Sequence, residues 1–127
     1  MNITKPLLLA VLVAFALLTS APARSGFLTG EDLLHSCSPP AVDPVYRLKV
    51  AECQGYVVAI ADASDCSRSN LEFKWNSSTG ASQGILVERV VDWLQAHPAL
   101  LHYQADGLVA AALSESFPCN SVTASGQ

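Results

Sequence analysis

Four cysteines constrain this chain of 127 residues more than any other feature of its sequence. Cys37, Cys53, Cys66 and Cys119 all follow an N-terminal segment that has the layout of an export signal. An even number of cysteines in a small exported domain indicates a disulfide framework, and four cysteines allow three connectivities. We favour Cys37–Cys53 with Cys66–Cys119, because the first pair links neighbouring elements and the second ties down the C-terminal end.

The N-terminal segment predicts a cleaved signal peptide. Lys5 precedes the apolar run LLLAVLVAFALL at residues 7–18, and the small-residue motif APA ends at residue 23. A membrane-spanning helix needs about 20 apolar residues, so this run is too short to serve as one. A short apolar run between a basic residue and a small-residue cleavage motif is typical of a secretory signal. We therefore expect a signal peptide at 1–23 and a single mature domain at 24–127.

The charge of the mature domain excludes some classes of partner. The whole chain has 7 Lys and Arg residues and 11 Asp and Glu residues. Removing Lys5 leaves 7 − 1 = 6 basic against 11 acidic residues, a formal charge of −5. A nucleic-acid-binding or anionic-membrane-binding surface needs clustered basic residues. We therefore expect no nucleic-acid partner and no membrane partner after signal cleavage.

Apolar spacing and capping residues predict an all-α fold. Thr29 can cap a short helix that stops near Cys37, and Asp43-Pro44 can open a long helix that runs to Ala63. Apolar residues at helical spacing then predict a third helix, capped by Ser82 or Thr79, and a last helix after a short turn at Pro98. These two helices span residues 83–96 and 105–115. The fold class is a small disulfide-stapled helical bundle of about four to five helices.

The predicted long helix has a ridge of small side chains. Ala51, Gly55, Ala59 and Ala63 recur every four residues. Glycine costs about 1 kcal/mol inside a helix, so a close approach by another helix would explain its presence. The alternative is that Gly55 is merely tolerated.

A polar stretch without helical periodicity follows at residues 64–81. Its sequence is SDCSRSNLEFKWNSSTGA. Irregular loops longer than about 15 residues are uncommon in compact domains and are often functional. Phe73 and Trp75 lie among its charges. This loop is therefore the first place to look for a partner.

No arrangement of residues in the chain indicates catalysis. There is no G-x-S-x-G motif, and two disulfides would leave no free thiol. The cysteines are too scattered for a zinc site, and the spacing of the three histidines does not indicate a complete set of metal ligands. We expect a non-enzymatic binding protein with no cofactor and no metal.

Four groups of residues recur in a characteristic order along the mature chain. They are Phe27-Leu28-Thr29-Gly30 with Leu33-Leu34 and Cys37; Cys53-x-Gly55-Tyr56-Val57 with Asp62; Val90-Val91-Asp92-Trp93-Leu94 with His97-Pro98; and Leu108-Val109-Ala110-Ala111-Ala112-Leu113 with Phe117-Pro118-Cys119. In these motifs and their order the chain resembles the Rap/Tai family of periplasmic immunity proteins, which neutralise peptidoglycan amidases delivered by type VI secretion. The resemblance covers nearly the whole mature chain.

The resemblance implies a periplasmic homodimer that presses a surface loop into the cleft of an amidase effector. The candidate contact residues are Arg68, Glu72, Phe73, Lys74 and Trp75. The alternative for the two aromatic residues is that they fold back and cover the core. The loop departs from the family pattern, since the cysteine expected just before the third helix lies upstream, so the identity of the partner does not transfer.

A second functional class remains open on the sequence. Periplasmic chaperones of the acid-stress type are also small, helical and disulfide-bonded. Such a chaperone would release apolar surface when its carboxylates and histidines titrate at low pH.

Overall fold

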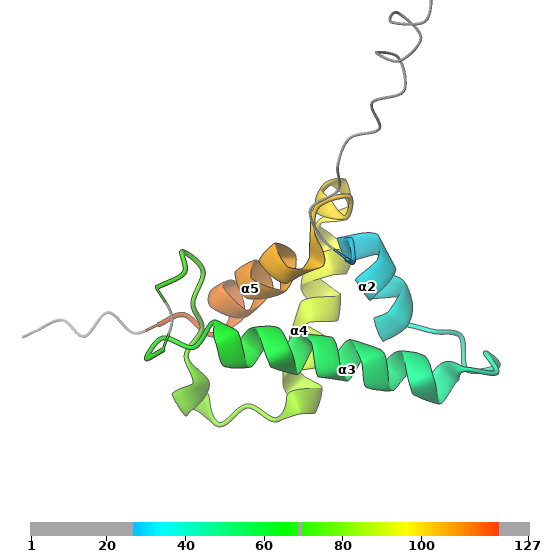
Figure 1. Cartoon of the computed structure of the whole chain (residues 1–127), viewed down its shortest axis with the longest axis horizontal. Coiled ribbons are helices and arrows are strands. Elements are labelled where there is room, and N and C mark those ends of the chain that lie inside the picture. Colours follow the sequence, from blue (N-terminus) through cyan, green and yellow to red (C-terminus); the bar gives the residue numbers. More distant parts are fainter. Residues whose placement is uncertain (1–26, 69, 120–127) are drawn as a thin grey trace, which may run out of the picture.

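The computed structural model describes residues 27–68 and 70–119, and these form an all-α bundle with no strand among them (Figure 1). The predicted fold class is therefore confirmed, while the predicted signal peptide at 1–23 lies outside the described residues. The four α-helices are α2 (Gly30–Cys37), α3 (Tyr46–Ala63), α4 (Gln83–Ala96) and α5 (Ala105–Ser116). Two short 3-10 turns, η1 (Ser77–Thr79) and η2 (Pro98–Leu100), lie between them.

The long helix α3 packs against each of the other three α-helices (Figure 1). The core between them is aliphatic, and its largest fully buried side chains come from all four helices. They are Leu33, Val57, Val90, Leu94, Val109 and Leu113. Each lies on the apolar stripe of its helix, so burial of these stripes accounts for the bundle.

Side-chain caps fix the starts of two helices. Thr29 Oγ1 accepts a hydrogen bond from the Asp32 backbone N–H at 3.2 Å, and the Asp32 carboxylate accepts one from the Thr29 N–H at 3.0 Å. This reciprocal arrangement is a capping box, worth about 1 kcal/mol. At α4 the Ser82 hydroxyl accepts from the Ile85 N–H at 3.4 Å. Of the two caps predicted for α4, Ser82 is the one observed.

The start of α3 differs from the prediction. The helix begins at Tyr46 rather than at Pro44, because the Asp43 carboxylate accepts from the Val45 N–H at 2.9 Å and shapes a turn. Local bonds of this kind compete with helix formation. Lys49 then reaches back to the same carboxylate, with Nζ and Oδ2 2.8 Å apart.

The small-residue ridge predicted on α3 faces solvent. Its members, Ala51, Gly55, Ala59 and Ala63, are all exposed. A Cβ added at Gly55 would meet no atom within 4 Å, so the expected close approach by another helix of the chain is wrong. The buried face of α3 carries Cys53, Val57 and Ala61.

A different glycine makes the close approach. Gly30 is buried at the start of α2, and its N–H donates to the Tyr103 carbonyl at 2.9 Å. A Cβ added there would lie 2.5 Å from Leu108 Cδ1 and 3.1 Å from the Leu101 carbonyl oxygen. Only a residue without a side chain lets α2 lie this close to the segment before α5.

We therefore expect opposite effects from two glycine-to-alanine substitutions. Gly30→Ala should lower the free energy of unfolding by about 1–3 kcal/mol, because the Leu108 side chain must shift and the Leu101 backbone must give way slightly to admit the methyl group. Gly55→Ala should raise it by about 0.5–1 kcal/mol, because alanine is the better helix former and meets nothing. Urea unfolding monitored by circular dichroism measures both. Equal effects at the two positions would contradict the packing described.

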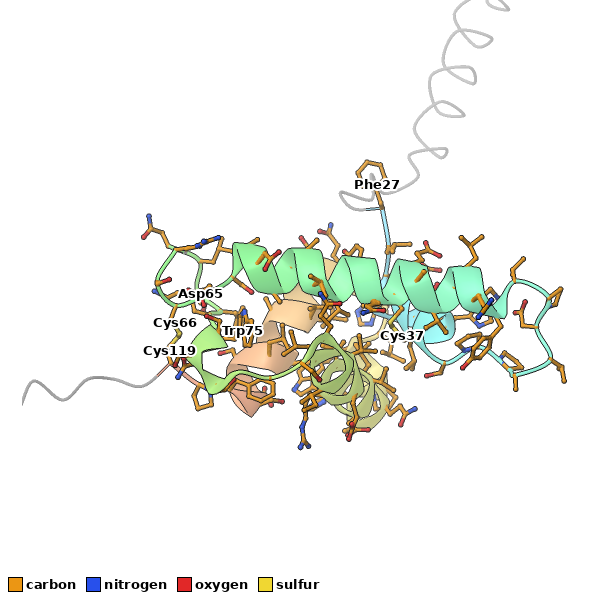
Figure 2. The ribbon with its side chains drawn as sticks, turned by 90° about the horizontal axis from the view of Figure 1, so that it is seen from below. Phe27, Cys37, Asp65, Cys66, Trp75 and Cys119 are labelled. Carbon is orange, nitrogen blue, oxygen red and sulfur yellow. A yellow bond between two sulfur atoms is a disulfide. The ribbon has the colours of Figure 1, made fainter. Side chains whose placement is uncertain are left out.

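The two disulfides are Cys37–Cys53 and Cys66–Cys119, the pairing favoured on sequence. The first joins the end of α2 to the middle of α3. The second joins the segment after α3 to the chain after α5, well away from Cys37 (Figure 2). Together they fasten both ends of the bundle to α3 and the segment that follows it.

Candidate functional site

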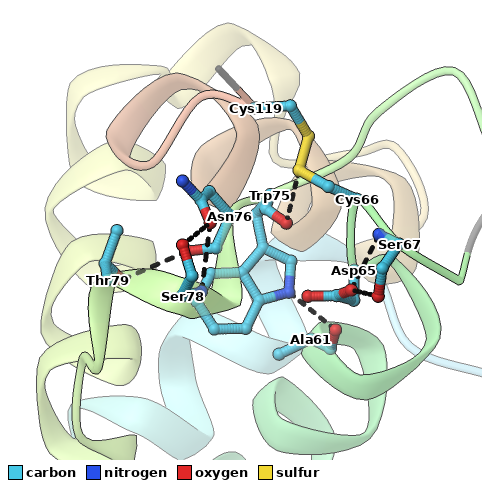
Figure 3. The surroundings of a disulfide bond; sticks show 9 residues. All are labelled: Ala61, Asp65, Cys66, Ser67, Trp75, Asn76, Ser78, Thr79 and Cys119. Carbon is cyan, nitrogen blue, oxygen red and sulfur yellow. Dashed lines mark hydrogen bonds between the residues drawn. A yellow bond between two sulfur atoms is a disulfide. The ribbon is translucent and has the colours of Figure 1, made fainter. Parts of the chain in front are cut away.

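Trp75 is the centre of the irregular loop that follows α3. Its side chain is 5% exposed, and its indole Nε1 donates to the Ala61 carbonyl oxygen at 2.7 Å (Figure 3). Its ring packs edge-on against Phe117, with the centroids 5.9 Å apart. The assignment of Trp75 as an exposed contact is therefore corrected. A large aromatic side chain with one hydrogen-bonding atom is well suited to a buried site with a carbonyl nearby, so Trp75 belongs to the core.

The backbone around Trp75 joins three parts of the chain. Its N–H donates to the Ser64 carbonyl at 3.0 Å, and its own carbonyl accepts from the Cys66 N–H at 3.0 Å. The next N–H, of Asn76, donates to the Phe117 carbonyl at 2.8 Å. The Cys66–Cys119 disulfide lies directly over this junction (Figure 3). The loop is thus held at its base by both hydrogen bonds and a covalent bond.

Asp65 adds an electrostatic component to the same junction. The carboxylate is 8% exposed and accepts hydrogen bonds from the hydroxyl and backbone N–H of Ser67, the latter at 2.8 Å. Hydrogen bonds from Ser67 and Ser77 hold the pKa of this carboxyl at about 2, below its ordinary value of 3.8. These bonds favour the charged form, so they stabilise the fold while Asp65 is ionised.

We expect Asp65 to make the protein sensitive to acid. Its pKa is lower in the folded state, so its stabilisation is present above pH 3.8 and is lost as the pH falls toward about 2. Asp65→Asn should be less stable than wild type at neutral pH and should lose less stability over that acid range. Urea unfolding at several pH values measures this. Asp62→Asn, an exposed carboxylate nearby, controls for the change in net charge, and an unchanged acid response in Asp65→Asn would contradict this role.

The remaining candidate contact residues lie on the outer part of the loop. Arg68, Glu72 and Phe73 are exposed, and Lys74 is half-buried. Phe73 is 44% exposed, so it stands at the surface while its neighbour Trp75 does not. The structure therefore leaves four of the five side chains at least partly exposed and buries the fifth, Trp75.

Sequence reasoning missed Leu71 and the residues of α5 that face this loop. Leu71 is 56% exposed beside Phe73, and its signal was an apolar side chain within a polar run. Nothing in the sequence of α5 indicated a binding surface, since the outward positions of this helix hold small or acidic residues that are typical of a solvent-exposed face.

Two hollows flank Phe73 on the outer side of α5. The larger, about 720 Å³, is lined by residues of the loop, α4, η2 and α5: Phe73, Trp93, Leu100, Tyr103, Gln104, Asp106, Gly107, Leu108, Ala111 and Glu115. The smaller, about 280 Å³, lies between the end of α3, the loop and α5: Ile60, Ala63, Ser64, Leu71, Glu72, Phe73, Asp106, Gly107 and Ala110. Concave, mostly apolar surfaces with a few polar groups are where binding sites usually form.

Within the described part of the chain, no group of three or more His, Cys, Asp or Glu residues could hold a metal ion. Within the same residues, no helix combines the length and the apolar character that crossing a membrane requires. The geometry provides an exposed apolar surface on a loop whose base is braced.

The fold and the site define a disulfide-bonded helical binding protein. The sequence model of the Rap1a immunity proteins matches residues 29–119, and the chain belongs to this family. The resemblance drawn from the sequence motifs is thus confirmed. Membership implies immunity to an effector of type VI secretion, and the protein is non-enzymatic. No curated protein matches the chain.

Proposed function

We propose that this protein acts in the periplasm and neutralises a peptidoglycan amidase by covering its substrate cleft with the loop after α3. The observation that carries this proposal is Phe73, an exposed aromatic side chain on a loop whose base is held by Trp75 and by the Cys66–Cys119 disulfide. Aromatic anchors dominate many interfaces, and a pre-ordered loop loses less entropy on binding.

The contact surface proposed for the amidase consists of the outward side chains of the loop. Leu71 and Phe73 supply apolar area, and Arg68, Glu72 and Lys74 are the charged side chains of the same loop. Apolar centres with polar rims are the usual anatomy of protein interfaces. Trp75 supports this surface from below and makes no part of it.

A periplasmic location is supported by two features of the chain. The N-terminal segment has the layout of a secretory signal, and both disulfides belong to an oxidising compartment. Effectors that cleave peptidoglycan act in that compartment, so an inhibitor there would meet its target. The family assignment favours immunity over the chaperone alternative.

We also propose that the protein is a homodimer, as the family resemblance implies. Several apolar side chains near the start of α3 are exposed, among them Val42, Val45 and Leu48. Clustered exposed apolar residues often mark an interface. Light scattering on the purified mature domain should give twice the monomer mass, and Leu48→Glu tests whether this cluster takes part.

The immunity function is tested by co-expression in the periplasm of a bacterial host. Amidase effectors of type VI secretion, including any encoded beside this gene, should lyse the host, and the wild-type protein should prevent lysis by its cognate effector. Phe73→Ala should weaken binding by about 30-fold or more, the loss expected for an interface hot spot. Isothermal titration calorimetry measures the affinity.

Phe27→Ala is the matched control for this variant. Phe27 is a fully exposed phenylalanine that lines neither hollow and lies far from Trp75 (Figure 2). Its loss should leave affinity within about twofold of wild type, as for residues outside an interface. A wild-type protein that protects against no amidase would overturn the proposed function. Protection that survives Phe73→Ala at full affinity would overturn the assignment of the loop.

A further inference from the structure

We propose that the two hollows beside Phe73 form one groove, and that the groove receives a segment of the effector in which Lys or Arg lies next to aliphatic or aromatic residues. This inference rests on the proposed function and specifies the chemistry of the partner. The groove would make the interface two-sided, because the loop enters the effector while a segment of the effector enters the groove.

The two hollows share part of their lining. Phe73, Asp106 and Gly107 line both of them, so a segment that crosses from one hollow to the other would pass the same three residues. The joint surface runs along the exposed side of α5, from the turn that precedes α5 to the end of α3.

The groove is apolar at both ends. Trp93, Leu100 and Tyr103 line the larger hollow, and Ile60 and Leu71 line the smaller one. Tyr103 and Leu71 are each more than half exposed, so these side chains form walls that stand open to solvent. Exposed apolar walls around a concave floor gain free energy when an apolar partner covers them.

The charges of the groove are all of one sign. Glu72, Asp106 and Glu115 line it, and none of its described lining residues is a Lys, an Arg or a His. Glu115 accepts a hydrogen bond from Trp93 Nε1 at 2.8 Å, and Asp106 accepts one from the Gly107 N–H at 2.8 Å. Neither bond neutralises a carboxylate, and no described residue forms an ion pair with any of the three.

The apolar walls and the acidic side chains of the groove together determine which kind of segment it can bind. A second acidic surface, including another copy of this acidic chain, would place like charges together in a partly desolvated groove. A segment with only apolar residues would leave the carboxylates without a countercharge. A Lys or Arg flanked by apolar residues satisfies both parts of the groove, and its cation can also lie against the faces of Trp93, Tyr103 or Phe73.

Gly107 provides a way to fill the groove without disturbing the fold. It lines both hollows, and a Cβ added there would meet no atom within 4 Å. Gly84 is the matched control, because it lies near the start of α4 and lines neither hollow. A Cβ added at Gly84 would meet only Ser82 Oγ, at 3.9 Å. A side chain at either position therefore begins in open space, and thermal unfolding verifies that both leucine variants stay folded.

The first test measures binding to the cognate amidase by calorimetry. Gly107→Leu should weaken binding by about 100-fold, while Gly84→Leu should stay within about threefold of wild type, since the central part of an interface dominates its affinity. The double variant Glu72→Gln with Asp106→Asn should weaken binding by about tenfold and reduce its dependence on salt. Folded Gly107→Leu that binds as tightly as wild type overturns the groove.

The second test uses a displayed library of random linear peptides and needs no effector. Peptides retained by the wild-type protein should combine Lys or Arg with aromatic or aliphatic residues, and Gly107→Leu should not retain them whereas Gly84→Leu should. Acidic peptides, or equal retention by Gly107→Leu, would overturn the inference. A wild-type protein that selects basic apolar peptides through the groove and protects against no amidase would sustain the groove and overturn the proposed function.

Discussion

Replacing Trp75 with alanine is expected to lower the free energy of unfolding by about 3–5 kcal/mol, the range for truncating a large buried aromatic residue. The side chain is 5% exposed, it packs against Phe117, and its indole N–H donates to the Ala61 carbonyl. The variant loses all three kinds of contact at once, and it leaves a cavity beneath the junction of α3, the loop and the C-terminal segment. A loss of this size approaches the whole stability of a small domain.

Guanidinium unfolding followed by far-ultraviolet circular dichroism measures this effect. Phe73→Ala is the control within the same loop, and it should cost about 1–1.5 kcal/mol, since Phe73 is 44% exposed and only part of its side chain is buried. Trp75→Phe should fall between them, because it keeps most of the apolar contact and loses a hydrogen bond worth about 1 kcal/mol. A Trp75→Ala variant as stable as Phe73→Ala would contradict the buried position of the indole.

This expectation changes how a binding defect in Trp75→Ala is interpreted. If Trp75→Ala fails to bind an effector, the failure reflects a loop that has lost its support, because the indole is not at the surface. Phe73→Ala carries the information about direct contact. The two variants together separate the stability of the loop from its recognition surface.

Breaking the Cys66–Cys119 disulfide is the second large expected effect. Its cysteines are 53 residues apart, and the chain-entropy model gives about 4 kcal/mol for a loop of that length. The double variant Cys66→Ser with Cys119→Ser should therefore be strongly destabilised. The Cys37–Cys53 bond closes a separation of 16 residues, for which the same model gives about 3 kcal/mol.

Thermal and guanidinium unfolding of the two double-serine variants measure both effects. The two variants should differ in the size of the stability loss and also in which part of the fold unfolds locally. Hydrogen exchange should rise around Trp75 and Phe117 when Cys66–Cys119 is absent, because the backbone bond from Asn76 to Phe117 loses its covalent brace. Protection that stays unchanged around Trp75 in this variant would contradict the role of the second disulfide.

Local features of the sequence were enough to place the helices. Ser82 sets the start of α4, and the Thr29–Asp32 capping box sets the start of α2, because a cap needs only residues a few positions apart. The same kind of local pattern at Asp43-Pro44 predicts a helix that starts at Pro44, two residues before the observed start at Tyr46. The Asp43 carboxylate instead accepts a hydrogen bond from the Val45 N–H and forms a turn, and helix propensity alone does not predict this competing bond.

Recognition of the family also followed from the sequence, since its motifs are spread from Phe27 to Cys119 and the family model matches residues 29–119. The class of protein could therefore be stated before the fold was known. The loop could be identified as irregular, because its serines, asparagines and charges lack helical periodicity. Which of its side chains point outward could not be identified in the same way.

Tertiary structure decided the features that carry the proposed recognition. Phe73 and Trp75 are two residues apart and chemically alike, yet one lies at the surface and the other beneath it. The difference comes from the Ala61 carbonyl and Phe117, which are 14 and 42 positions away from Trp75 (75 − 61 and 117 − 75). The solvent exposure of the ridge on α3 and the two hollows beside α5 could not be predicted for the same reason. Helical periodicity shows that a helix has faces, but only packing between distant segments determines which face meets a neighbour and which remains open to a partner.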